Sequence, residues 1–173
     1  MYNFFNLDKK TRDFMISEIN WAIKNNELYF SKRFIDNQEE KWKKLLLEAA
    51  QNHDEHWLAF EIENNLMLKG FEAARKPKGG YTTKHVPDTA SETLASGQFN
   101  RYYILGLSQR AIEEGKNTLE VYRAKESQSP RQESEVLIDQ KLNTAKLIEQ
   151  LRPVDSSFKS ELLKPNSGLS VKL

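Results

Sequence analysis

Hydrophobic residues recur at helical spacing along much of the chain. In residues 8–26 the apolar positions fall three or four residues apart, which predicts a helix with one buried face, and Asp8 is a suitable N-cap. The same spacing predicts a second helix that is capped by Asp36 and a third helix over residues 55–69. Residues 28–34 are aromatic and fit either a strand or an extended connector.

The clearest helix start lies in the middle of the chain. Thr89 and Glu92 have the spacing of a capping box, in which each side chain accepts a free backbone N–H of the first turn. Gly97 would divide the region that follows into a short helix and a longer one over residues 99–114. This longer helix is apolar almost all round, so we expect it to be the central helix of the fold.

Two tyrosines of this central helix, Tyr102 and Tyr103, have two interpretations. Core packing with the hydroxyl near the surface is the ordinary role of such a residue, and we favour it. The functional alternative is a platform on which nucleic-acid bases stack.

The rest of the chain predicts a small β element and a tail. Residues 118–123 alternate and are rich in β-branched and aromatic side chains, and residues 135–142 are a second strand candidate. Asn143 would cap a last short helix. We therefore expect a mostly helical α+β fold, with about five helices around a central one, a small two-stranded element and an extended C-terminal tail. The globular domain would span residues 1–152 and the tail residues 153–173.

The tail is rich in serine, and its apolar residues are too sparse to build a core of their own. Spaced apolar side chains on an extended segment suit pockets on a neighbouring protein. The expected docking residues are Leu162, Leu163, Leu169, Val171 and Leu173.

Residues 71–86 show no periodicity, and we expect an irregular basic loop there. Gly79 and Gly80 would let backbone N–H groups approach a phosphate, although the spacing of a P-loop is absent. We favour a solvated surface loop over this phosphate-binding interpretation, and a contact with an acidic protein neighbour is a variant of the functional interpretation. The candidate phosphate or partner contacts are Arg75, Lys76, Lys78 and Lys84.

The overall composition and charge limit the binding partners and the cellular location that we expect for the protein. The 26 Lys and Arg nearly cancel the 25 Asp and Glu, so a net charge of +1 provides no global attraction to nucleic acid or to an anionic membrane. The absence of cysteine excludes disulfides, thiolate nucleophiles and cysteine-ligated zinc. No signal peptide or membrane-spanning run is visible. We expect a cytoplasmic protein or a component of a virion assembled in the cytoplasm.

His53 and His56 are the only pair with metal-ligand spacing, because residues three apart share a helix face. A third ligand is missing from the local sequence. We therefore favour a polar helix junction in which Asp54 caps the next helix, and we expect neither a metal nor a cofactor.

A second mixed-charge group surrounds the turn after residue 123. Its members are Arg123, Lys125, Arg131, Glu133 and Glu135. Metal-dependent nucleases place carboxylates and a lysine across a sheet, and this group does not complete that pattern. Ordinary surface charge is the favoured interpretation.

A pattern of short segments runs through the C-terminal half, at residues 99–104, 111–115, 119–125, 130–131, 133–135 and 165–171. In these segments the chain resembles a family of small uncharacterised bacterial and prophage-type proteins. The resemblance is a pattern of segments and contains no catalytic motif. It implies no activity, and it associates the chain with phage virion structural proteins.

Together these features favour a non-enzymatic structural or connector subunit of a larger assembly, and the assembly that we expect is a bacteriophage particle, in its head or head–tail connector region. Its partners would be other protein subunits, in a homo- or hetero-oligomer, with no membrane. The alternative is a nucleic-acid-directed protein, including an enzyme, that uses the basic loop.

Overall fold

Three of the described helices start at an N-cap residue whose side chain accepts a backbone N–H of the first turn, and two of these caps are Asp8 and Asn143. Asp8 accepts the backbone N–H of Thr11 at 3.0 Å, where α1 (Lys9–Lys24) starts. Asn143 caps α6 (Thr144–Leu151) in the same way, so the caps predicted at these two positions are confirmed. The computed structural model describes residues 1–126, 130–155, 160–165 and 167–173.

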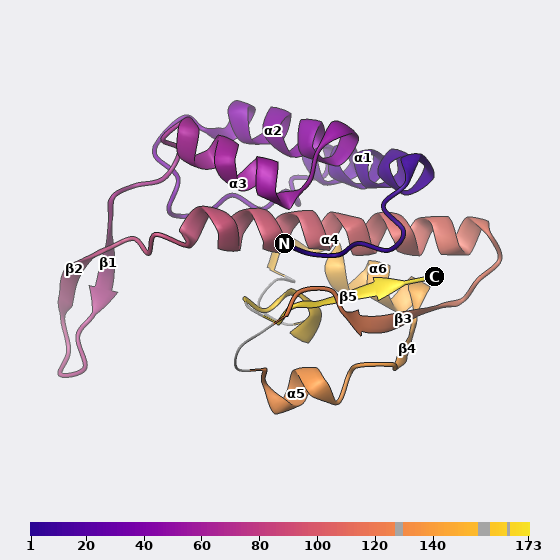
Figure 1. Ribbon diagram of the computed structural model, residues 1–173. Helices are drawn as coiled ribbons and strands as arrows, with labels where there is room; N and C mark the ends of the chain where they lie inside the picture. The colour runs from indigo at the N-terminus through magenta and orange to yellow at the C-terminus, as the bar shows by residue number, and fades with distance from the viewer. Residues whose placement is uncertain (127–129, 156–159, 166) are drawn as a thin grey trace.

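The long helix α4 (Ala90–Glu113) runs through the middle of the molecule (Figure 1). Its predicted central position is confirmed, but two details were wrong. Gly97 does not divide it, and the side chain of Thr89 makes no capping hydrogen bond. The backbone carbonyl of Thr89 instead accepts the N–H of Thr93 as part of the first turn.

Helices lie on one side of α4 and a small sheet with α6 lies on the other (Figure 1). The helical layer contains α1, α2 (Glu39–Asn52) and α3 (Glu55–Asn64). The core is continuous on both sides of α4, because α4 has buried residues all round its surface. Its largest fully buried side chains include Trp42, Phe99, Tyr102, Tyr103 and Met15.

Two helix boundaries differ from the prediction. The N-cap of α2 is Gln38 and not Asp36, so α2 begins at Glu39. α3 ends at Asn64, before the predicted stop, because Leu66 adopts a left-handed backbone with φ of 50°. The chain then turns outward, and Leu68 forms an antiparallel bridge with Phe34.

The sheet on the other side of α4 has three antiparallel strands in the order β4-β3-β5. The predicted strand at 118–123 is confirmed as β3 (Thr118–Arg123). The second candidate strand was placed too early, because α5 (Gln132–Glu135) precedes β4 (Lys141–Asn143). The third strand is β5 (Leu169–Lys172), which pairs Val171 with Val121. The mostly helical α+β class is confirmed.

The C-terminal segment is part of the fold, which corrects the expectation of an extended tail outside it. Strand β5 adds to β3, and the short 3-10 helix η2 (Glu161–Leu163) packs beneath α4. Four of the five expected docking residues are therefore buried in the chain's own core, and the fifth is partly buried against it. They are Leu162, Leu163, Leu169 and Val171, followed by Leu173.

A buried arginine ties this segment to the central helix. The guanidinium group of Arg101 on α4 donates hydrogen bonds to three carbonyls at the end of α6, those of Leu151 (2.9 Å), Arg152 (2.6 Å) and Pro153 (3.1 Å). A cation is favoured at the C-terminal end of a helix, and here the guanidinium group caps these carbonyls. Burial lowers the pKa of Arg101. The role of this side chain is structural.

Candidate functional site

The predicted basic loop is a β-hairpin, which corrects the expectation of irregular structure. Strand β1 (Phe71–Arg75) pairs with β2 (Tyr81–His85) in antiparallel register. The β-branched pair Thr82 and Thr83 favours the extended backbone of β2. We refer to residues 69–86 as the arm.

Glycines at the tip allow the chain to reverse. Gly79 and Gly80 have φ angles of 93° and 81°, a region that side chains disfavour. The N–H of Gly79 donates to the carbonyl of Lys76 at 3.1 Å, and the N–H of Lys76 donates to the carbonyl of Gly80 at 3.0 Å. The two bonds close the tip, so Lys76 and Lys78 are presented at the end of the ribbon.

The base of the arm is fixed by charge and by ring packing. Glu72 forms ion pairs with Arg33 from the connector before α2 (2.7 Å) and with Lys84 across the ladder (3.1 Å). Hydrogen bonds from Arg33 and then from Lys84 lower the pKa of Glu72 to about 2. On the other face, the rings of Phe71 and His85 pack with centroids 4.2 Å apart.

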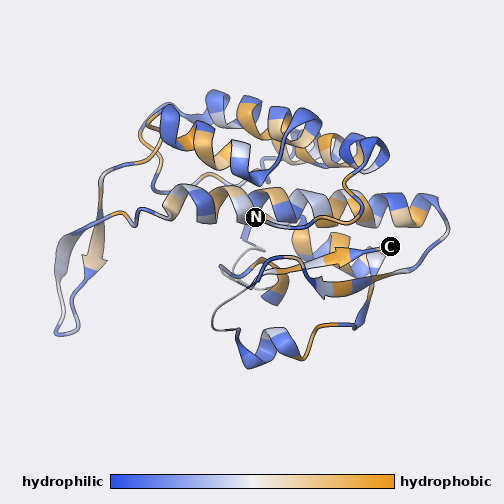
Figure 2. Ribbon diagram, viewed as in Figure 1, coloured by the Kyte–Doolittle hydropathy of each residue, from blue (hydrophilic) through white to orange (hydrophobic). Residues whose placement is uncertain are grey.

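Beyond this base, the arm extends away from the body (Figure 1), and its two strands pack mainly against each other. Each strand spans about 17 Å at the usual rise per residue. Hydrophilic residues cover the tip (Figure 2). An element that buries so little of its own surface contributes little to the core, which favours a role in contact with a partner.

The structure separates the four predicted contact residues into two groups. Arg75, Lys76 and Lys78 lie exposed at the tip and form no ion pair with any residue that the structure describes. Lys84 lies nearer the base, where it is paired with Glu72. The first three cations are free to meet an anionic partner, whereas Lys84 belongs to the anchor.

Charge is concentrated in the arm. Residues 69–86 contain the cations Lys69, Arg75, Lys76, Lys78 and Lys84 and a single acidic residue, Glu72. The segment therefore carries a net charge of +4, although the whole chain carries only +1. The near-neutral total conceals this local basic patch, and the remainder of the chain is acidic.

Sequence reasoning missed the ribbon and its exposed aromatic residues. Tyr81 is 76% exposed and Phe71 is 55% exposed, both on the arm. Two short runs joined by a five-residue connection that contains Gly79 and Gly80 are a recognised hairpin signal. This signal was weak because Phe71–Arg75 contains two alanines, and its second and fifth residues are charged.

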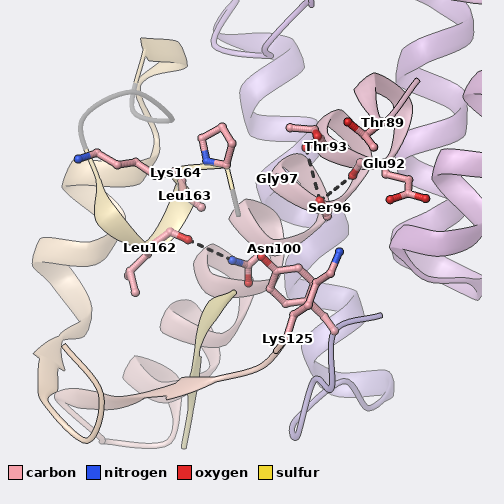
Figure 3. A pocket seen from close by; sticks show the side chains of 12 residues that line it. Thr89, Glu92, Thr93, Ser96, Gly97, Asn100, Lys125, Leu162, Leu163 and Lys164 are labelled. Atoms are coloured by element: carbon pink, nitrogen blue, oxygen red, sulfur yellow. Dashed lines mark hydrogen bonds between the residues drawn. The ribbon is translucent and has the colours of Figure 1, made fainter. Parts of the chain in front are cut away.

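A cavity of about 160 Å³ lies between the first turns of α4 and residues 162–165 (Figure 3). Its central polar side chain, Asn100, is fully used by the fold. The amide nitrogen donates to the carbonyl of Leu169 at 2.9 Å, and the amide oxygen accepts from Ser170 at 2.7 Å. Ser96 likewise donates to the carbonyl of Glu92 within α4 at 2.6 Å. The contacts of Asn100 hold β5 against α4. The polar groups of Asn100, Ser96 and Ser170 are therefore used in structural hydrogen bonds, and these three side chains form no catalytic arrangement.

The histidine pair lies at a helix junction. Asp54 caps α3 by accepting the N–H groups of His56 (3.0 Å) and Trp57 (2.9 Å), as the polar-junction interpretation predicted. The ring of His53 stacks on Trp57 with centroids 4.2 Å apart. Within the described residues, no three His, Cys, Asp or Glu side chains gather in a way that could hold a metal ion.

The charged group after β3 fastens chain segments to one another. Arg123 pairs with Glu135 and also donates to the carbonyl of Ser167 at 3.0 Å, while Arg131 donates to the carbonyl of Pro165 at 2.8 Å. These arginines therefore hold α5 and the residues before β5 against the sheet.

The tyrosines of the central helix are core residues. Tyr102 and Tyr103 are 1% and 0% exposed, so neither ring is accessible to a base. The hydroxyl of Tyr103 accepts the backbone N–H of Asn6 at 3.1 Å, which ties the N-terminal segment to α4. The stacking alternative for these two residues was wrong.

No known family matches this chain, and no match was found among curated proteins or solved structures. Among the helices that the structure describes, none has both the length and the apolar character needed to cross a bilayer.

Proposed function

We propose that this protein binds nucleic acid through its arm and performs no catalysis of its own. The observation that carries the proposal is the set of unpaired cations, Arg75, Lys76 and Lys78, at the end of a ribbon that extends from an otherwise acidic body. Cations on a protruding element can approach a polyanion without bringing the acidic body close to it. The phosphate backbone is the polyanion that such an arrangement fits.

The expected contacts are with phosphates and are independent of sequence. Each phosphate that is neutralised releases bound counterions, and this release makes affinity fall as salt rises. Three tip cations would contribute a slope of roughly 2 to 3 in a plot of log affinity against log salt concentration. Phosphate contacts position a protein but do not specify a base.

A subunit of a larger assembly, such as a phage particle, is the second candidate. The observation that favours it is a groove of about 190 Å³ between α3 and α4, at which Phe60 is 59% exposed and Met1 is 69% exposed. Glu63 and Glu92 line the same groove. Three glutamates against one lysine, Lys125, make this lining acidic on balance, which is complementary to the basic arm of a second copy. In this alternative the arm, and not the C-terminal segment, would make the contact between subunits.

A charge-matched comparison tests the proposal. The tip variant is R75Q/K76Q/K78Q, and the control is K116Q/K141Q/K146Q, which removes three exposed lysines outside the arm. We expect the parent protein and the control to bind heparin and a mixed-sequence oligonucleotide in a salt-dependent manner. The tip variant should elute from heparin at lower salt. In the plot of log oligonucleotide affinity against log salt concentration, its slope should be smaller than that of the parent by roughly 2 to 3.

The same proteins separate the two candidates. A parent protein that fails to bind the oligonucleotide at low salt, or a tip variant that binds as well as the control, contradicts the proposal. If the parent forms oligomers by analytical ultracentrifugation and only the tip variant is monomeric, the assembly function is correct. Circular dichroism of all three proteins checks that the substitutions leave the fold intact.

A further inference from the structure

The two faces of the arm differ in composition and in accessibility. In an antiparallel ladder, paired residues project to the same face, and the faces alternate along each strand. The register places Phe71 opposite His85 and Arg75 opposite Tyr81. One face, called here the open face, contains Phe71, Ala73, Arg75, Tyr81, Thr83 and His85. The other, called here the anchored face, contains Glu72, Ala74, Thr82 and Lys84.

The anchored face is the one that is tied to the body. Glu72 and Ala74 on this face are partly buried, and Glu72 is held by Arg33. Every residue of the open face is exposed. The arm is therefore held by an ion pair on one face, and the residues of the opposite face are exposed along its length.

Aromatic rings lie at both ends of the open face. Tyr81 is near the tip, beside Arg75, and the packed rings of Phe71 and His85 are at the base. Between them are only the small residues Ala73 and Thr83. A flat ring or base could lie across these small side chains without a clash, and a guanidinium group can also stack on a base.

We propose that the open face binds single-stranded nucleic acid by stacking unpaired bases, with Tyr81 as the main stacking residue. This inference rests on the proposed function of the arm and defines its preferred substrate. Exposed aromatic side chains beside cations on a β surface are the usual means of holding single strands without sequence preference. In a duplex the bases are already stacked, so a duplex would meet only the cations of the tip.

The experiment compares a fluorescent short oligothymidylate with a mixed-sequence duplex of the same length, by anisotropy, at one salt concentration. The test variant is Tyr81→Ala, with Tyr81→Phe as the conservative variant and Thr82→Ala, from the anchored face of the same strand, as the matched control. We expect Tyr81→Ala to weaken binding of the oligothymidylate roughly 5- to 150-fold, the usual effect of losing one stacked base. Tyr81→Phe and Thr82→Ala should bind as the parent does.

Duplex binding distinguishes this inference from the proposed function. We expect duplex affinity to be lower than that for the single strand and unchanged by Tyr81→Ala. If Tyr81→Ala leaves single-strand binding intact, or if the duplex binds more tightly, the stacking inference is wrong. In that case, if the tip variant R75Q/K76Q/K78Q binds either oligonucleotide more weakly than the parent does, the proposed function of the arm is still supported. If the parent binds neither oligonucleotide, both proposals fail.

Discussion

The guanidinium group of Arg33 forms two hydrogen bonds with the carboxylate of Glu72, from Nε to Oε2 at 2.7 Å and from Nη2 to Oε1 at 3.0 Å. A planar fork of this kind fixes orientation as well as distance. It joins the connector before α2 to the first strand of the arm, 39 residues later in the chain. The direction in which the arm leaves the body therefore depends on this pair.

Acid should release the arm from this anchor. Hydrogen bonds from Arg33 and Lys84 lower the pKa of Glu72 from 4.5 to about 2. Since the folded-state pKa is depressed, the anchor is complete above about 4.5 and is lost as pH falls towards 2. NMR titration of the Glu72 carboxyl carbon measures this directly. A midpoint near 4.5 would show that the ion pairs do not form, and Glu72→Gln identifies the resonance by removing it.

Two glycines of α4 should respond in opposite directions to alanine. A Cβ at Gly106 would lie 2.7 Å from the backbone nitrogen of Met15, whereas one at Gly97 would meet nothing within 4 Å. Gly106→Ala should therefore cost about 1–3 kcal/mol by forcing α1 away. Gly97→Ala should stabilise the protein by up to about 1 kcal/mol, because alanine favours the helix. Urea denaturation measures both, and equal effects would contradict the close contact of α1 with α4.

Tyr103 should contribute to stability and not to binding. Tyr103→Ala removes a fully buried ring and should lower the free energy of unfolding by roughly 3–5 kcal/mol. Tyr103→Phe keeps the ring but loses the hydrogen bond from Asn6, and it should cost about 0.5–1.5 kcal/mol. Chemical denaturation measures both values. A Tyr103→Phe protein that retains its stability but loses oligonucleotide affinity would contradict this role.

The C-terminal segment should be required for cooperative unfolding. Leu169→Ala empties a fully buried position and should cost about 2–5 kcal/mol. Leu173→Ala, at a partly buried position near the same edge, is the milder control. Deletion of residues 154–173 removes β5 and η2 together and should abolish the cooperative thermal transition. A truncated chain with a sharp transition would show that the segment is an accessory tail after all.

Local signals located the helices well. Asp8 and Asn143 cap the helices predicted for them, because a cap joins residues only two or three positions apart. Helical spacing located α4 at the centre because its apolar surface extends all round. The cations of the arm were also visible in the sequence, since charge needs no partner to be recognised.

Contacts between distant segments decided the rest. The sparse apolar residues Leu169 and Val171 resemble a tail in isolation, and they become core only because β3 supplies ladder partners and α4 covers them. Tyr102 and Tyr81 have the same side chain, yet one is buried and the other is 76% exposed. Residue type sets what a side chain can do, whereas burial depends on which distant segments pack against it. Folding also decides which cations of the arm are paired. It brings Glu72 to Lys84 and Arg33, whereas the cations at the tip form no ion pair with any described residue.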